Sequence, residues 1–240
     1  SNTGGSPLID GFTIGYNSSY SNVFTNKDTV DYVAWCWRAG GNKGTWNVDG
    51  VGYDTAAKAG LDGGSIDPTG ASVNTKAGFG IYKYEGNGGS GATIAHGLPN
   101  EPAFIMIKRL DGYSGSDNAG DWMVGCDSVI ENSVADWTYY MVLNKDQGKV
   151  AYAWCNMPGL CKVGQYQGTG SATDSPVIYT GFKPALIMIK RVDSANDWNM
   201  QDIVRSPFNE MDNEVLQANS NSSESNIGTG YARDNLSNGF

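Results

Sequence analysis

The run FIMIKR at residues 104–109 returns, with one substitution, as LIMIKR at residues 186–191. Each copy has four large apolar residues followed by Lys-Arg. This is the length of a strand, and its first four residues are apolar enough to be buried on both faces of a sheet while the basic pair reaches solvent. A core-strand sequence that occurs twice in one chain predicts duplicated β units.

Flanking segments repeat with the sextets. YEGNG at 84–88 matches YQGTG at 166–170, again 82 residues apart, whereas GDWMV at 120–124 matches NDWNM at 196–200, 76 residues apart. The spacing changes within a stretch rich in Gly, Asn and Asp, as expected for a surface loop. The matches therefore extend over most of two units.

Two further matches concern late strands and chain ends. DYVAWCW at 31–37 resembles VAYAWCN at 150–156, and LIDGF at 8–12 resembles LSNGF at 236–240. We therefore expect residues 8–37 to supply the strands that the last unit lacks, either within one chain or to a neighbouring copy.

The predicted fold class is all-β, with tandem antiparallel β-sandwich units that are jelly-roll-like. Turn signals every 8–12 residues and strands rich in aromatic and β-branched residues favour this class. The expected organisation is a partial β unit at 1–41 with late strands, a Gly-rich linker at 42–76, a sandwich repeat at 77–156, and a repeat lacking its final strands at 162–240.

Composition limits the partners. The net charge is −9, with charged residues at 17%. An acidic chain without a basic block is a poor candidate for binding nucleic acid. No stretch reaches the 18 apolar residues of a membrane span, so membrane insertion is not expected.

Chemical groups for catalysis are sparse in the sequence. The single histidine, His96, precedes a turn, where packing or hydrogen bonding is its expected role. The four cysteines form no CxxC pair, and we expect buried free thiols rather than a Cys155–Cys161 disulfide. We therefore predict no catalytic residues, no cofactor and no metal site, although a calcium-binding loop at 111–121 is an alternative.

Aromatic residues offer the candidate contacts with a sugar or a partner protein. They are Tyr113 in the loop, Trp46 in the expected linker, and Tyr139 and Tyr140. Carboxylates are numerous enough that a glycosidase pair stays open as an alternative.

Several segments together resemble a repeat found in predicted tail-fibre and other tail proteins of tailed bacteriophages, largely marine ones. They are YVAWCWRAGG (32–41), GFGIYKYEGNGGSGATIAHGLPNEPAFIMIKR (78–109), and the stretch from KVGQYQGTG (162–170) to LSNGF (236–240). The first unit departs from the family pattern because it has no sextet.

The resemblance implies a non-enzymatic structural virion protein, assembled in the host cytoplasm. Its implied partners are other copies of itself, other virion proteins and a host-surface glycan. Two alternatives stay open: a secreted glycan-active module, either lectin or depolymerase, and an extracellular filament assembled by strand donation.

Overall fold

The structure is a computed structural model in which every described regular element is a β-strand. The all-β prediction is confirmed. Contacts divide the chain into Ser1–Trp37 and Arg38–Phe240, and each is described by itself. The structure describes residues 11, 12, 14, 31–89, 91–110, 123–126, 148–171, 174–194, 196–207, 214–220, 222–224 and 233–240.

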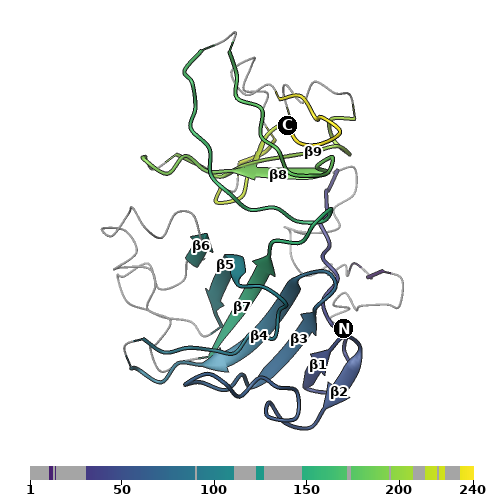
Figure 1. Ribbon diagram of the computed structural model, residues 1–240, viewed down its shortest axis with the longest axis vertical. Coiled ribbons are helices and arrows are strands. Elements are labelled where there is room, and N and C mark those ends of the chain that lie inside the picture. Colours follow the sequence, from purple (N-terminus) through teal and green to yellow (C-terminus); the bar gives the residue numbers. More distant parts are fainter. Residues whose placement is uncertain are drawn as a thin grey trace, which may run out of the picture. The chain divides into compact units, whose positions relative to one another are not determined.

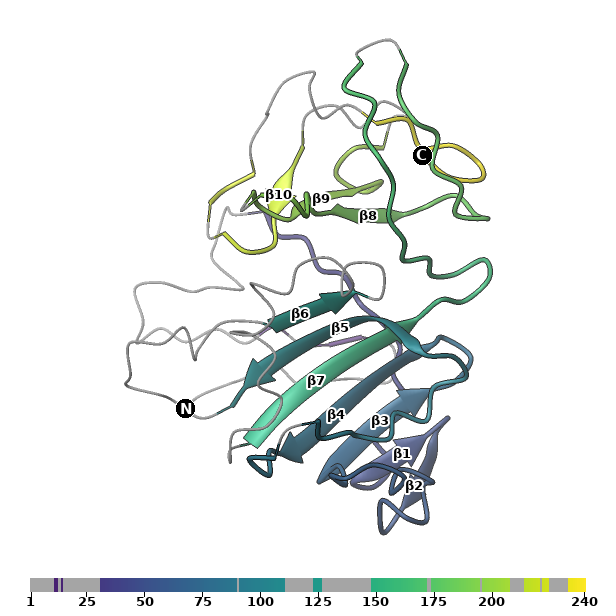
Figure 2. The same ribbon diagram turned by 60° about the vertical axis from the view of Figure 1, so that its left-hand side comes forward.

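Seven strands of Arg38–Phe240 form one sheet (Figures 1 and 2). Their order across the sheet is β2 (Val51–Tyr53), β1 (Trp46–Val48), β3 (Gly70–Asn74), β4 (Phe79–Glu85), β7 (Gly148–Cys155), β5 (Pro102–Arg109) and β6 (Met123–Cys126). All neighbours are antiparallel except β1 and β3, which are parallel, so the sheet is mixed rather than purely antiparallel.

The prediction of a Gly-rich linker at 42–76 is wrong, because these residues contribute β1, β2 and β3 to the sheet. Its Gly and Asp residues mark tight turns between short strands. Asp49 (φ 51°) and Gly50 (φ 85°) form the two-residue turn of the β1–β2 hairpin, a position that requires positive φ. The amide of Asn47 braces this turn, since its Oδ1 accepts the Gly50 N–H at 3.1 Å.

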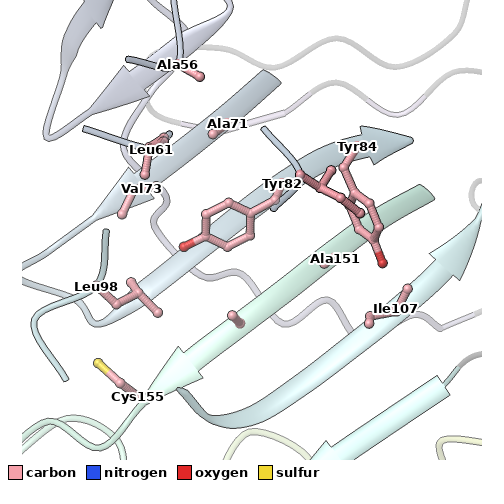
Figure 3. Close-up of a cluster of buried hydrophobic side chains, with 12 residues drawn as sticks. Ala56, Leu61, Ala71, Val73, Tyr82, Tyr84, Leu98, Ile107, Ala151 and Cys155 are labelled. Atoms are coloured by element: carbon pink, nitrogen blue, oxygen red, sulfur yellow. The ribbon is translucent and has the colours of Figure 1, made fainter. Parts of the chain in front are cut away.

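One face of the sheet carries the core shown in Figure 3. Ala71, Tyr82, Ala151 and Ile107 lie side by side on four adjacent strands, and all are buried. Large and small side chains alternate across this row, which lets the Tyr82 ring fit between two alanines. A Cβ at Gly80 would collide with the same ring, so that position also has to stay small.

A second sheet has three antiparallel strands in the order β10, β9, β8 (Figure 2). They are β8 (Leu186–Ile189), β9 (Asn199–Asp202) and β10 (Leu216–Gln217). Both sextets thus contain strands, as predicted. The prediction that these two strands are buried on both faces is wrong, however. Only Ala103 and Ile107 of β5 and Ile187 of β8 are buried, while their neighbours are half-exposed. One-sided burial is consistent with sandwich character. The arrangement as tandem units stays a prediction.

Candidate functional site

The two sextets form hairpins in the same register. Phe104 of β5 lies opposite Cys126 of β6, and Leu186 of β8 lies opposite Asp202 of β9. The first residues of these pairs are 82 apart and the second residues are 76 apart, which are the offsets of the sequence matches. The hairpins therefore pair equivalent residues, although the loops that connect their strands differ in length.

The turn before each hairpin is also built the same way. The Leu98 N–H donates to His96 Nδ1 at 3.0 Å, and the Phe182 N–H donates to Thr180 Oγ1 at 3.4 Å. The residue between each pair is a glycine with positive φ, 63° at Gly97 and 86° at Gly181. A side-chain acceptor two residues before the bonded N–H is a common way to close such a turn.

A second turn is repeated upstream. The Gly89 N–H donates to Asn87 Oδ1 at 3.0 Å, and 82 residues later the Ser171 N–H donates to Thr169 Oγ1 at 3.3 Å. Here too the middle residue is a glycine with positive φ, 72° at position 88 and 69° at position 170. Two turns and one hairpin thus share their geometry, although the side chains differ.

The two hairpins differ in what lies on their other side. In the first, β7 lies between β4 and β5 (Figure 2). Leu110 N–H donates to Gly148 O at 3.0 Å, so the even-numbered residues of β5, Met106 among them, direct their backbone groups to β7. In the second hairpin, β9 is the only described strand that pairs with β8.

The backbone of β8 shows which groups are left at its outer edge, meaning the edge away from β9. Ile203 N–H donates to Ala185 O at 3.1 Å, so the odd-numbered residues of β8 are those that bond β9. The backbone N–H and C=O groups of Leu186 and Met188 therefore point to the outer edge. Leu186 and Met188 are equivalent to Phe104 and Met106 of β5, whose backbone groups bond β7.

The segment around β8 also buries little apolar surface. Among the described residues after 155, three large or medium apolar side chains are buried: Ile187, Met200 and Val215. Seven are exposed: Leu160, Tyr166, Val177, Tyr179, Val192, Ile203 and Val204. The stretch from 38 to 155 shows the opposite balance, with the whole of the core cluster and two exposed side chains, Val51 and Leu110. The segment after residue 155 therefore has fewer buried and more exposed apolar side chains than the stretch from 38 to 155.

Charged groups near β9 stabilise a corner. The Arg205 guanidinium bonds Asp202 Oδ2 at 2.7 Å and Glu224 Oε1 at 2.6 Å, and it also donates to the Glu214 carbonyl at 3.0 Å. Burial raises the pKa of Asp202, but hydrogen bonds from Arg205 outweigh burial and leave the pKa below its usual value. The charged groups of this cluster bond one another and the backbone, so it resembles a brace more than a reactive site.

The predicted contact residues are mostly untested. Tyr113, Tyr139 and Tyr140 lie outside the described residues, as does the loop at 111–121. Trp46 is half-buried in β1 rather than exposed, packs against the core, and donates its Nε1–H to Pro68 O at 2.8 Å. The indole of Trp46 therefore has a structural role at the sheet.

The reactive groups that the structure describes are held in structural positions. His96 is half-buried, and burial lowers its pKa, so the neutral ring is favoured. All four cysteines are free: Cys155 is buried and Cys36 is exposed, contrary to the expectation of a buried thiol there. In the described stretches, no group of three His, Cys, Asp or Glu side chains is arranged to hold a metal ion.

Sequence reasoning missed the residues of the outer edge, Leu186 and Met188. The sequence held only part of the signal: the sextet match and the match between 31–37 and 150–156 indicate that a strand is missing, but which edge it would join depends on the hydrogen bonds along β8. The Arg205 cluster had no such signal, because its three acidic or carbonyl partners are scattered over 23 positions between 202 and 224.

A family model described as a domain of unknown function (DUF7483) matches two successive segments, residues 6–149 and 141–240. No curated protein and no solved structure matches the chain. No helix among the described residues is both long enough and apolar enough to span a membrane.

Proposed function

We propose that this chain, which belongs to the DUF7483 family, is a non-enzymatic structural protein of a phage virion, in a tail fibre or a related appendage. The proposal combines the resemblance of its repeats to phage tail proteins with the way in which the two hairpins are built.

One observation carries the structural part of the proposal. The chain has a single histidine, His96, and its Nδ1 closes a turn by accepting the Leu98 N–H. At the equivalent turn, Thr180 accepts the Phe182 N–H. The two repeats therefore keep the hydrogen bond and change the chemical group. His96 therefore acts in this turn as a hydrogen-bond acceptor, which is a structural role that does not require its ring to titrate.

The other ionisable groups with shifted pKa values fit the same role. Burial raises the pKa of Tyr84 to about 12 and raises that of Tyr82 further. Both rings belong to the core, and Tyr82 Oη donates to the His96 carbonyl at 2.5 Å. Shifts of this kind arise wherever a polar side chain is packed into a core.

The proposal predicts where the protein is found. Mass spectrometry of purified virions from a phage that encodes this chain should detect it at a stoichiometry comparable to that of other appendage proteins. Antibodies against the chain should label the tail in negative-stain micrographs. A chain absent from purified particles and present in the cleared medium would contradict the proposal.

The depolymerase alternative has its own test. The purified chain would be incubated with capsular and lipopolysaccharide glycans of the host, and the release of reducing ends would be measured. We expect no release above the buffer control. Release that is lost on changing one Asp or Glu would replace the structural proposal with an enzymatic one.

A further inference from the structure

We propose that the outer edge of β8 binds residues 31–37 of a second copy of this chain as an added antiparallel strand. The inference deepens the proposed structural role, on which it rests, by naming the partner and the segment. Three observations carry it: the edge itself, a sequence that matches the strand at the equivalent edge, and complementary side chains in the implied register.

The edge is the one that β7 fills in the first hairpin. Residues 150–155 of β7 and the following residue 156 read VAYAWCN, and residues 31–37 read DYVAWCW. Aligned without a gap, Val33 takes the place of Tyr152, which lies opposite Met106. Because Met188 is the equivalent of Met106, Val33 falls opposite Met188.

The same alignment gives the whole register. By it, residues 31–35 lie opposite residues 190–186 in antiparallel order. The implied pairs are Asp31 with Lys190, Tyr32 with Ile189, Val33 with Met188, Ala34 with Ile187 and Trp35 with Leu186.

Charge favours this register. In the first hairpin Lys108 lies opposite Val150 of β7. In the proposed contact the equivalent Lys190 lies opposite Asp31, so a carboxylate replaces an apolar side chain beside the ammonium. Lys190 Nζ bonds two carbonyls, at 2.6 and 2.8 Å, and its charge also helps to lower the pKa of Asp193, so Asp31 would be a second carboxylate near the ammonium. Opposite charges on directly paired residues stabilise an antiparallel ladder.

Side-chain volume favours it as well. In the first unit Ala151 lies between the Tyr82 ring and Ile107. In the proposed contact the larger Tyr32 takes the place of Ala151. The position equivalent to Tyr82, which is 82 residues later, is Gly164, and nothing lies within 4 Å of a Cβ placed there. By this sequence equivalence, the bulky aromatic side chain is Tyr82 in the first unit and Tyr32 in the proposed contact, so each repeat has one large residue at this pair of positions.

A second copy is the proposed donor, and donation within one chain is the competing outcome that the cross-linking test separates. Residues 31–37 are described without strand structure. Their side chains include Tyr32 and Trp37, which are 49% and 47% exposed. Donor and acceptor are different surfaces of one chain, so the contact is heterologous, and each bound copy offers a new edge to the next. Repeated addition would build a head-to-tail array, as expected of an appendage.

Mixed cysteine variants test the contact. Val33→Cys and Met188→Cys would be made in separate chains, both carrying Cys36→Ser, then mixed and oxidised. Paired residues of this type have Cα atoms about 5.5 Å apart, within the range of a disulfide. We expect a disulfide-linked heterodimer whose 33–188 cross-link is identified by peptide mass mapping. Val33→Cys mixed with Ile187→Cys is the control, because these side chains face opposite sides of the sheet, and little link is expected.

An unmutated chain gives a second readout that does not depend on the variants folding. Its sedimentation coefficient should rise with concentration, and a synthetic peptide of residues 30–38 with Cys36→Ser should lower it, whereas a scrambled peptide should not. A chain that stays monomeric up to its solubility limit would overturn the proposal. So would a 33–188 cross-link that forms in a double variant but never between mixed single variants, since the strand would then come from the same chain. Neither result affects detection of the chain in virions, which tests the structural role separately.

Discussion

His96 and Thr180 occupy the same position of the same turn, and each accepts the N–H of the residue two positions later. The first prediction follows from this equivalence. His96→Thr should keep the free energy of unfolding within experimental error. His96→Val, which has the shape of Thr without its hydroxyl, should lower it by about 1 kcal/mol, the usual net value of one hydrogen bond. Urea unfolding of the three proteins measures the difference. If His96→Thr and His96→Val lowered the free energy of unfolding equally, the imidazole ring, and not its acceptor atom, would stabilise the turn.

The second prediction concerns pH. Burial lowers the pKa of His96, and the nearby Glu101 opposes this without cancelling it. The folded pKa therefore lies below the unfolded value of about 6.5, and folding favours the neutral ring. Its contribution is fully present above the unfolded pKa and declines as the pH falls through that value toward the folded pKa.

The measurement compares unfolding free energies of the unmodified chain and His96→Thr at about pH 8 and about pH 5. The unmodified chain should lose more stability than the variant on acidification, because only it carries the titrating ring. A variant that loses as much as the unmodified chain would assign the pH dependence to other groups.

The third prediction concerns the Arg205 cluster. Arg205 and Asp202 have side chains that are 12% and 4% exposed, so removing the guanidinium leaves a buried carboxylate without its cation. Arg205→Met should cost about 3–5 kcal/mol. Arg191→Met is the matched control, because Arg191 pairs with Asp193 at side-chain exposures of 62% and 67%. That change should cost less than about 1 kcal/mol. Comparable losses by thermal unfolding would contradict the contrast in burial.

The fourth prediction concerns the core of the second hairpin. Ile187 is buried and Val204 is 79% exposed. Ile187→Asp should expose the amides of β8 and β9 to hydrogen exchange, because an unpaired buried charge costs several kcal/mol. Val204→Asp should leave their protection unchanged. Normal protection in Ile187→Asp would show that this strand does not depend on its inward face.

The sequence could predict the strands of both sextets and the equivalence of their hairpins, because a strand that is apolar and repeated carries its own pattern. It could not predict β1, β2 and β3. Those strands are three to five residues long, and their density of Gly and Asp resembles that of a linker. Their position in the sheet depends on tertiary contacts such as the parallel pairing of Val48 with Val73, which leaves no local signal.

The candidate site was predictable only in outline. The sequence matches indicated that the last unit lacks a strand and that residues 8–37 could supply it. They could not say which edge was open, since that depends on the alternation of hydrogen bonds along β8. Trp46 shows the reverse error, because an aromatic residue among glycines resembles a surface contact until its indole is seen bonded to Pro68 O.

The central claim is that β8 is the counterpart of β5 with a second copy in place of β7. Hydrogen exchange at single-residue resolution tests it most directly, through the amides of Met106 and Met188, measured in dilute and in concentrated protein. Met106, bonded to β7, should be protected at both concentrations. The Met188 amide should exchange fast when dilute and become protected when concentrated, as the added strand forms. Protection of Met188 in the dilute monomer, or fast exchange at every concentration, would contradict the account.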